Sequence, residues 1–368
     1  MNRPADGITT AAAKPKLRSR RGGAAIPLDE DDKRLMNLLQ SSFPLDPRPF
    51  DAIAAEAGLD LGDVLSRTAR LLEGRIIREI TPIFDTRALG YSSMLVAAKV
   101  DTEHPHRAAE IINSHPGVSH NYLRTHEFNL WFTIATPPDS ELGLEGTLEL
   151  LQRLTGAESI RQLPTLTLFK INMNLEMEGG TEELAAPAAE AVVPRELERQ
   201  AYDDGDVAVI RALQGPMEPV ERPYDDAASE LGISTEALLE HLQGMVDRKL
   251  LRRVAAILFH RRAGFSANGM GVWRVPDEKI AEVGARMAAV RGISHCYQRP
   301  TYPDWPYSVF TMAHGRSKEE CDAILDGIAD EHELHGDDRA VLYSSTEYKK
   351  VRLHYFTPDY AAWEAQHS

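Results

Sequence analysis

The stretch Pro116-Gly117-Val118-Ser119-His120-Asn121-Tyr122-Leu123-Arg124 occurs a second time in this chain of 368 residues, as Arg291-Gly292-Ile293-Ser294-His295-Cys296-Tyr297-Gln298-Arg299-Pro300. Both copies have the frame Gly-aliphatic-Ser-His-x-Tyr-x-Arg, and an aromatic segment follows each, over 129–133 and 307–311. We call the two stretches the first and the second frame. Their recurrence predicts a chain built from two related halves.

The similarity between the halves extends outward from the frames. Upstream, Arg48-Pro49-Phe50-Asp51 matches Arg222-Pro223-Tyr224-Asp225. Downstream, Phe169-Lys170 corresponds to Tyr348-Lys349. The offset is about 175 residues, which indicates a duplicated pair of domains and excludes a solenoid of short repeats.

Each half begins with a helical pattern and continues with alternating strands and helices. Apolar residues at helical spacing predict three short helices over 30–40, 50–57 and 61–73, and a strand hairpin begins at Ile76. This order is typical of a winged helix-turn-helix. The elements that follow have the order β-α-β-β-α-β of a ferredoxin-like domain. They are predicted over 93–100, 106–114, 120–124, 130–135, 144–154 and 166–173 in the first half, and over 269–275, 277–289, 295–299, 307–314, 318–329 and 348–355 in the second.

The sequence therefore predicts an α+β fold, a tandem duplication of a winged helix-turn-helix and a ferredoxin-like domain. The predicted boundaries are 1–27 for a basic, disordered tail, 28–84 and 85–177 for the first pair of domains, 178–200 for a linker rich in Glu, Ala and Pro, and 201–258 and 259–368 for the second pair.

The composition is that of a soluble globular protein, with 43% hydrophobic and 26% charged residues and no apolar run long enough to span a bilayer. Cys296 and Cys321 are too few for a disulfide framework, which indicates a reducing cytoplasm. No Cys/His cluster has the spacing of a zinc site, so we expect no protein-bound metal. The formal net charge of −15 weighs against nucleic acid as a partner, because phosphate binding requires a basic surface.

A winged helix-turn-helix followed by a ferredoxin-like domain resembles the Lrp/AsnC family, in which ferredoxin-like domains pair, so a fused chain is expected to form an internal pseudo-dimer. More specific motifs resemble siroheme decarboxylase. The first frame, with Leu89-Gly90-Tyr91-Ser92-Ser93 and His126-Glu127-Phe128-Asn129, looks like its first subunit. The second frame, with Pro303-x-Trp305-Pro306-Tyr307 and Thr311-Met312-x-His314-Gly315, looks like its second subunit. The chain is thus similar to both subunits fused.

The resemblance implies an activity and a substrate. Siroheme decarboxylases remove the carboxyl groups of the acetate side chains at C12 and C18 of siroheme, giving 12,18-didecarboxysiroheme and two CO2 on a route to heme d1 or heme b. The substrate itself carries iron, and a protonated macrocycle can accept the electron pair that decarboxylation leaves, so no separate cofactor is expected. The implied partners are siroheme and, beyond the internal pseudo-dimer, a second copy of the chain or separate decarboxylase subunits.

Protonation of the carbon that loses CO2 requires an acid that titrates near neutrality, and histidine is the usual choice. His120 and His295 are the candidate catalytic acids. Period-two alternation along a strand places the His, Tyr and Arg of one frame on one face. Asn121 stands where the second frame has Cys296, which argues against a cysteine nucleophile. The motif Pro303-x-Trp305-Pro306-Tyr307 follows the second frame alone, so the sequence favours the second frame as the site.

Eight carboxylates on a flat macrocycle require cations and aromatic surface. Each of these residues also has an ordinary explanation as strand packing or as a solvated charge. The candidate carboxylate holders are Arg124, Arg299, Arg252, Arg261, Lys170 and Lys349, the candidate ring contacts are Tyr122, Tyr297 and Trp305, and His126 and His260 are candidate ligands of a carboxylate or of the substrate iron.

The alternative is a DNA-binding regulator that senses a small molecule. In the second half, the helix expected to enter the major groove carries Glu236, Glu240 and Asp247, which phosphates would repel. We therefore interpret the helix-turn-helix modules as scaffold and expect neither DNA nor a membrane as a partner.

Overall fold

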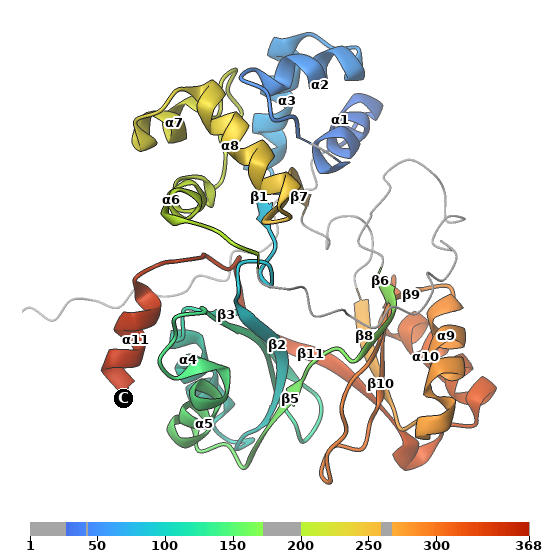
Figure 1. The fold of residues 1–368 in the computed structure, drawn as a ribbon. Helices are drawn as coiled ribbons and strands as arrows, with labels where there is room; N and C mark the ends of the chain where they lie inside the picture. The colour runs from blue at the N-terminus through green and yellow to red at the C-terminus, as the bar shows by residue number, and fades with distance from the viewer. Residues whose placement is uncertain (1–26, 42, 172–199, 259–266, 368) are drawn as a thin grey trace, which may run out of the picture.

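The computed structural model describes residues 27–41, 43–171, 200–258 and 267–367. Residues 1–26 of the expected tail, residues 178–199 of the expected linker, and the candidate site residues His260 and Arg261 lie outside the described residues. The described part contains the two helix-turn-helix units and the two ferredoxin-like domains that the sequence predicts (Figure 1).

Each helix-turn-helix unit consists of three helices followed by one strand. Gly58 and Gly232 end the second helix of each unit with φ values of 69° and 68°, a left-handed conformation that glycine adopts without strain. They make the tight turn between the second and third helices. The elements are α1 (Glu30–Ser41), α2 (Pro49–Ala57), α3 (Leu61–Glu73) and β1 (Ile77–Phe84) in the first unit, and α6 (Asp204–Leu213), α7 (Asp225–Leu231), α8 (Thr235–Asp247) and β7 (Leu251–Leu258) in the second.

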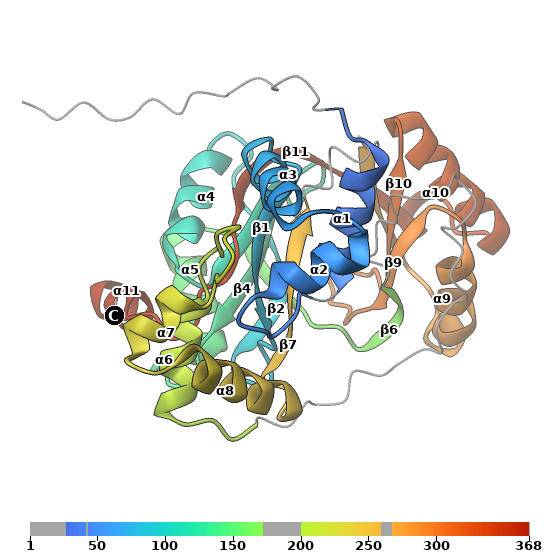
Figure 2. The ribbon, with the colours of Figure 1, turned by 90° about the horizontal axis from the view of Figure 1, so that it is seen from above.

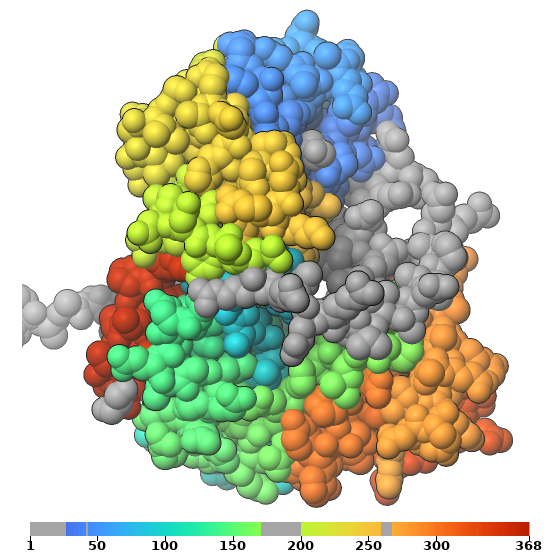
Figure 3. All heavy atoms as spheres, in the orientation of Figure 1, coloured from blue at the N-terminus to red at the C-terminus, as the bar shows by residue number. Residues whose placement is uncertain are grey.

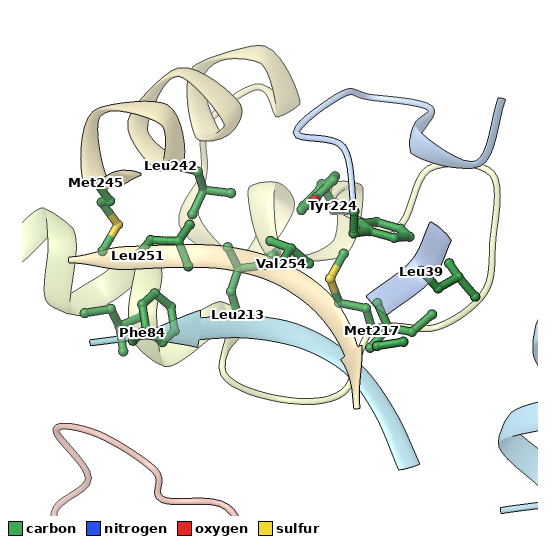
Figure 4. Packing of buried hydrophobic residues seen from close by; sticks show 14 of the residues in the cluster. Leu39, Phe84, Leu213, Met217, Tyr224, Leu242, Met245, Leu251 and Val254 are labelled. Carbon is green, nitrogen blue, oxygen red and sulfur yellow. The ribbon is translucent and has the colours of Figure 1, made fainter. Parts of the chain in front are cut away.

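A two-stranded ribbon joins the two units. β1 pairs antiparallel with β7, so the backbone N–H and C=O groups of each strand form hydrogen bonds with the strand from the other half. The predicted hairpin within each unit is therefore wrong, because each unit supplies a single strand to the ribbon. One hydrophobic core runs through both units, and Figure 4 shows residues from both halves in it, Leu39 and Phe84 from the first and Leu213, Leu242 and Val254 from the second.

Each ferredoxin-like domain packs two helices against one face of its strands. The order β-α-β-β-α-β is the one that the sequence predicts. The first domain contains β2 (Ser92–Lys99), α4 (Pro105–Ser114), β3 (Val118–Arg124), β4 (Leu130–Thr136), α5 (Gly143–Thr155) and β5 (Ser159–Leu163), and β6 (Thr167–Ile171) follows it; the second contains β8 (Ala267–Trp273), the 3-10 turn η2 (Asp277–Lys279), α9 (Ile280–Ala289), β9 (Ile293–Gln298), β10 (Val309–Gly315), α10 (Lys318–His332), the 3-10 turn η3 (Gly336–Asp338) and β11 (Arg339–Lys350).

The two domains share one nine-stranded sheet in the order β5-β2-β4-β3-β11-β8-β10-β9-β6. The first part of β11 pairs with β8 of its own domain, and its last part pairs with β3 of the first domain. β6 crosses in the opposite direction and pairs with β9. Each half thus contributes a strand to the sheet of the other: β6 pairs in the second domain, and the end of β11 pairs in the first.

Two strand predictions are corrected by this exchange. The fourth strand of the first domain is β5, and not 166–173, because Pro164 ends β5 and the chain then crosses to the second domain. The last strand of the second domain is Arg339–Lys350, and not 348–355, because β11 has no proline and runs through both pairings without a break.

The two halves of the sheet turn their helix-free faces toward each other. Helices α4 and α5 cover the outer face of the first half, and α9 and α10 cover that of the second (Figures 1 and 2). The core between the halves takes side chains from both domains, among them Trp131, Met270, Trp305, Phe310 and Leu342. This arrangement confirms the internal pseudo-dimer.

After β11 the chain returns to the first domain. Helix α11 (Asp359–His367) lies beside α4, as the red segment in Figure 3 shows. There the indole Nε1 of Trp363 donates a hydrogen bond of 2.9 Å to Ser114 Oγ. Closer to β11, Val351 N donates to Ser119 O at 2.8 Å. The second half therefore completes the surroundings of the first frame.

Candidate active site at the first frame

The frames form the strands β3 and β9, and a glycine opens each of them. A Cβ atom on Gly117 would lie 1.8 Å from the backbone oxygen of Ala135, so a larger residue would displace the neighbouring strand. Gly292 instead adopts a φ of 91°, which side chains other than glycine rarely tolerate. The same sequence position thus needs glycine in both halves, for two different physical reasons.

The His, Tyr and Arg of each frame lie on one face of the strand, as the alternation predicts. His120 stacks on Tyr122 with ring centroids 6.2 Å apart, and the Arg124 guanidinium lies 5.9 Å from the centre of the Tyr122 ring. The second frame repeats the series, with 6.0 Å between its His and Tyr rings and 4.9 Å from its guanidinium to the Tyr ring.

The residue that follows the histidine faces the helices. Asn121 Nδ2 donates to Asn113 Oδ1 in α4 at 3.0 Å, and the Cys296 thiol donates to Gly284 O in α9 at 3.5 Å. Burial raises the pKa of the Cys296 thiol far above its usual range. A buried thiol that stays protonated is a poor nucleophile, so Cys296 packs the second domain.

The arginines of the two frames are buried between the halves of the sheet. Arg124 Nη1 donates to Leu342 O in the second domain at 3.3 Å, and Arg299 Nη1 donates to Leu163 O in the first domain. Burial lowers the pKa of each guanidinium to about 10. Each arginine thus connects its frame to the opposite domain, and neither lines the cavity described below.

Trp305, a predicted contact of the substrate ring, lies in the inter-domain core. Its side chain is 0% exposed and packs against Trp131 and Phe310, with ring centroids 5.3 and 6.0 Å away. His126 lies against the same indole, and its Nδ1 accepts a hydrogen bond of 3.1 Å from Phe128 N. Burial lowers the pKa of His126. These residues therefore build the inter-domain core and the turn between β3 and β4.

A cavity of about 280 Å³ opens in front of His120. Its walls come from three parts of the fold: the ribbon provides Arg78 and Ile257, the first frame provides Ser119 and His120, and the segment after β11 provides Arg352. Both halves of the chain are needed to build this cavity, because the ribbon and the returning C-terminal segment each bring residues of the second half to the first domain.

The surroundings of His120 are cationic. Burial lowers its pKa, Lys350 and Arg78 lower it further, and Glu347 acts in the opposite direction. The imidazole is therefore neutral at pH 7 while the cavity holds no anion. A carboxylate that enters the cavity raises the pKa of His120, because an opposite charge nearby favours the imidazolium. Binding of an anionic ligand thus favours the protonated form of His120, which can act as an acid.

Arg352 brings a half-buried positive charge to the wall. Its guanidinium donates to Thr81 Oγ1 and Pro82 O on β1, and to Gln214 O at 3.2 Å. All three acceptors are neutral, and burial lowers the pKa of Arg352. Arg78 lies on the same side and is 3.5 Å from the carboxylate of Glu79. Glu79 also lines the cavity, so the wall holds two arginines and one carboxylate, and the excess of one positive charge favours an anionic group.

Arg252, Lys349 and Lys170, which the sequence analysis also singled out, do not line the His120 cavity. Arg252 is exposed and binds Asp85 at 2.6 Å, beside a second cavity of about 330 Å³ that has no frame histidine in its wall. Lys349 Nζ donates to Asn113 O at 2.9 Å, where it complements the C-terminal end of α4. Lys170 is buried in β6.

Two residues of the cavity were missed by the sequence reasoning. Arg78 has a signal in the repeat, because Ile76-Ile77-Arg78 matches Leu250-Leu251-Arg252, and only the second arginine was singled out. Arg352 has no such signal, because it reaches the first domain through the strand exchange of β11.

A third missed residue, His115, lies in the turn just before the first frame. Its Nδ1 accepts a hydrogen bond of 3.0 Å from Gly117 N, and its ring packs against Trp363 of α11 with centroids 4.6 Å apart. Burial lowers its pKa to about 3, so the ring is neutral. His115 therefore holds the turn that leads into β3.

Several basic side chains of the helix-turn-helix units form ion pairs within the protein. Arg67 in α3 binds Asp32 and Asp63 at 2.9 and 2.8 Å. At the end of α8, Arg248 binds Asp206 at 2.7 Å, the repeat counterpart of Asp32. Asp32 and Asp206 are both buried. Cations held in this way are not available to a phosphate backbone, which supports a scaffold role for the units.

Within the ranges that the structure describes, no three His, Cys, Asp or Glu side chains gather where they could hold a metal ion. In the same ranges, no helix combines the length and apolar content needed to cross a membrane.

Both kinds of domain match known sequence families. Residues 32–78 and 206–252 match the siroheme decarboxylase NirDL-like HTH domain, and residues 88–170 and 262–349 match the AsnC-like ligand binding domain. The siroheme decarboxylase of Hydrogenobacter thermophilus is 40% identical over 336 residues, which cover 91% of this chain and 97% of that protein. The siroheme decarboxylase beta subunit of Methanosarcina barkeri is 39% identical over 153 residues, which cover 41% of this chain and 99% of that subunit.

The fold is also that of a solved relative. A crystal structure of the siroheme decarboxylase NirDL in complex with an iron-uroporphyrin III analogue has a TM-score of 0.73 to this chain at 33% identity, and the match covers 92% of this chain and 98% of that one. The agreement extends over both halves, which confirms the Lrp/AsnC-like pseudo-dimer.

Proposed function

The chain belongs to the siroheme decarboxylase family, and we propose that it removes CO2 from the acetate side chains at C12 and C18 of siroheme to give 12,18-didecarboxysiroheme. The observation that carries this proposal is the composite cavity at the first frame. It places a neutral histidine beside arginines from both halves of the chain. Such a site attracts a carboxylate and gains an acid when the carboxylate binds.

The reaction divides between the substrate and the protein. The bond between the methylene carbon and the carboxylate breaks, CO2 leaves, and the electron pair passes into the protonated macrocycle. A proton is then added to the same carbon, which becomes a methyl group. Arg78 and Arg352 hold carboxylates of the substrate, and His120 supplies the proton. The macrocycle is the electron sink, so the reaction needs no further cofactor.

The volume of the cavity limits the part of the substrate that enters it. Pockets for drug-sized ligands range over roughly 300–1,000 Å³, and a tetrapyrrole with eight carboxylates is larger than such ligands. A cavity of about 280 Å³ therefore holds one acetate-bearing edge of the ring. Because siroheme loses two acetate carboxyl groups, each edge reaches His120 in turn.

The two halves of the chain supply both sides of the cavity. We therefore expect the chain to act without separate decarboxylase subunits, and this expectation distinguishes it from relatives that are single subunits. The two cysteines, Cys296 and Cys321, are buried and unpaired, which favours a reducing compartment such as the cytoplasm.

Anaerobic incubation of the purified chain with siroheme tests the proposal. Product masses that show the loss of two CO2 support it, whereas siroheme that binds and stays intact would identify a carrier without chemistry. A mobility-shift assay at low salt is the companion measurement. Sequence-selective DNA binding by a chain that leaves siroheme intact would support the regulator instead.

A further inference from the structure

Ser119 and His120 lie on the same side of β3, although neighbouring residues of a regular strand point to opposite faces. Ser119 Oγ is 3.0 Å from His120 Nδ1. The cause is a β-bulge: Val118 pairs with Ile134 and His120 with Thr133, so β3 has one residue more than β4 at this point. The extra residue is Ser119. Bulges of this kind redirect a side chain and are frequent beside active sites.

The second frame has the same feature. Ile293 pairs with Ala313 and His295 with Met312, which makes Ser294 the extra residue of β9. Ser294 Oγ is 2.7 Å from His295 Nδ1. The two halves differ at many other positions, including the residue just after the histidine. The bulge and its Ser–His contact are therefore a common property of both frames, independent of what lies in front of each.

The contact determines which nitrogen of His120 is left for a ligand. In the described part of the chain, Nδ1 contacts the serine hydroxyl and no protein partner is found for Nε2, while the residue lines the cavity. We propose that Ser119 is a positioning residue, which holds Nδ1 of His120 so that Nε2 transfers the proton to the substrate. This inference rests on the proposed function, in which His120 is the acid.

A serine hydroxyl suits this role because it can both donate and accept a hydrogen bond. When His120 is an imidazolium, Ser119 Oγ accepts from Nδ1–H, and Nε2–H points toward the methylene carbon. The Nε2–H bond breaks and a C–H bond forms with the electron pair that CO2 has left behind. His120 is then neutral with its remaining hydrogen on Nδ1, still bound to Ser119, and Nε2 regains a proton from solvent through the cavity.

The bulge is held from the other side by the second half of the chain. The carbonyl oxygen of Ser119 accepts a hydrogen bond of 2.8 Å from Val351 N, in the segment that also brings Arg352 to the cavity. The backbone of the serine is thus fixed while its hydroxyl remains available to the imidazole.

The test compares Ser119→Ala with Ser119→Thr, and uses Ser294→Ala as the matched control at the other bulge. Hydrogen bonds to charged groups correspond to effects of roughly tenfold or more. We expect Ser119→Ala to lower kcat for siroheme about tenfold with KM unchanged, and to shift the acid-dependent limb of the kcat profile to lower pH, because the imidazolium loses its acceptor. Ser119→Thr keeps the hydroxyl at a position that lines the cavity, so it should retain the wild-type kcat and profile.

A nitrogen NMR spectrum of protein with 15N-labelled histidine gives a second measurement. A purely structural role of Ser119 would not change the nitrogen shifts of His120. The Ser119→Ala change should alter the Nδ1 and Nε2 shifts of His120 and leave those of His295 in place. The inference is overturned if Ser119→Ala keeps the wild-type kcat, pH profile and nitrogen shifts, or if Ser119→Thr is impaired equally. A fully active His120→Ala variant would instead refute the proposed role of His120, so the two failures are distinguishable.

Discussion

The strands β3 and β9 present the same Ser-His-x-Tyr-x-Arg series on the same kind of bulge, but of the two cavities described above, one is lined by His120 and neither by His295. His120 faces a cavity whose walls include Arg78 on the ribbon and Arg352 after β11. Arg252, the repeat counterpart of Arg78, lies near the other end of the ribbon and binds Asp85. Duplication thus supplies two equal frames, and within the described residues the ribbon and the returning C-terminal segment bring arginines to the first of them.

The comparison is tested most strongly by changing the two histidines separately. Loss of a general acid typically costs between about 100- and 10,000-fold in rate. We expect His120→Asn to reduce both losses of CO2 by about 1,000-fold, and His295→Asn to leave most of the activity. Product masses over time provide the measurement. If His295→Asn is the inactive variant, or if each variant stops after one CO2, the second frame takes part in the chemistry, as the sequence favours.

The pH dependence of the wild type adds a test of the same acid. Burial, and then neighbouring cations, keep the pKa of His120 below its usual value in the free protein, and substrate carboxylates raise it. A required acid is lost as pH rises through its pKa. The plot of kcat/KM, which reports the free protein, should therefore fall at a lower pH than the plot of kcat, which reports the complex. Coincident plots would contradict this electrostatic account.

The next effect concerns the arginines between the domains. Arg299 donates to Leu163 O across the inter-domain core. Removing its side chain leaves a void and an unpaired carbonyl, so we expect Arg299→Ala to lower the free energy of unfolding by about 3 kcal/mol. Arg299→Met keeps most of the volume and removes a buried charge, so its cost should be near or below about 1 kcal/mol.

Urea unfolding and the KM for siroheme together decide the role of Arg299. A structural role predicts a stability loss with an unchanged KM. If Arg299→Ala instead raises KM at wild-type stability, the sequence expectation of a carboxylate holder is right and the packing explanation is not.

The fold was largely predictable from the repeat, because helix and strand periodicities are local properties of the sequence. The order of elements in each domain and the pseudo-dimer were predicted correctly. The pairing of β1 with β7 was not, since each strand alone reads as half of a local hairpin. The exchange of β6 and the end of β11 was also missed, because strand patterns show where a strand lies and not which half it joins.

The site shows the same limit. The shared face of each frame followed from strand alternation. The burial of Arg124 and Trp305 could not be predicted in this way. A sequence motif does not show whether an arginine or a tryptophan contacts a ligand or packs against a second sheet. Arg352 enters the cavity only through the strand exchange. The sequence motifs thus identified His120 as a candidate, and they gave no indication of a residue such as Arg352, which the strand exchange brings to the cavity.

His115 marks a smaller difference between the halves, since Val290 occupies the corresponding place before the second frame. The pKa of His115 is about 3 in the folded protein and about 6.5 when unfolded. Below pH 6.5 the unfolded chain takes up a proton that the folded protein does not, so stability is lost as pH falls. The loss amounts to about 2 kcal/mol between pH 7.5 and 5.

The variant His115→Asn isolates this contribution, because its side-chain oxygen can still accept from Gly117 N. Urea unfolding at both pH values should show a shallower acid loss for the variant than for the wild type. Equal losses would mean that His115 titrates as readily in the folded protein as in the unfolded chain.

The smallest expected effect separates the two ends of the ribbon. Arg78→Gln removes a cation from the wall of the His120 cavity, and Arg252→Gln removes its repeat counterpart beside Asp85. We expect Arg78→Gln to raise the KM for siroheme about tenfold, which corresponds to about 1.4 kcal/mol, and Arg252→Gln to leave it nearly unchanged. Arg78 also lowers the pKa of His120, so the kcat/KM profile of Arg78→Gln should move to higher pH while that of Arg252→Gln stays in place. Equal effects of the two variants would show that the ribbon serves both frames alike, and the assignment of the cavity to the first frame would then be wrong.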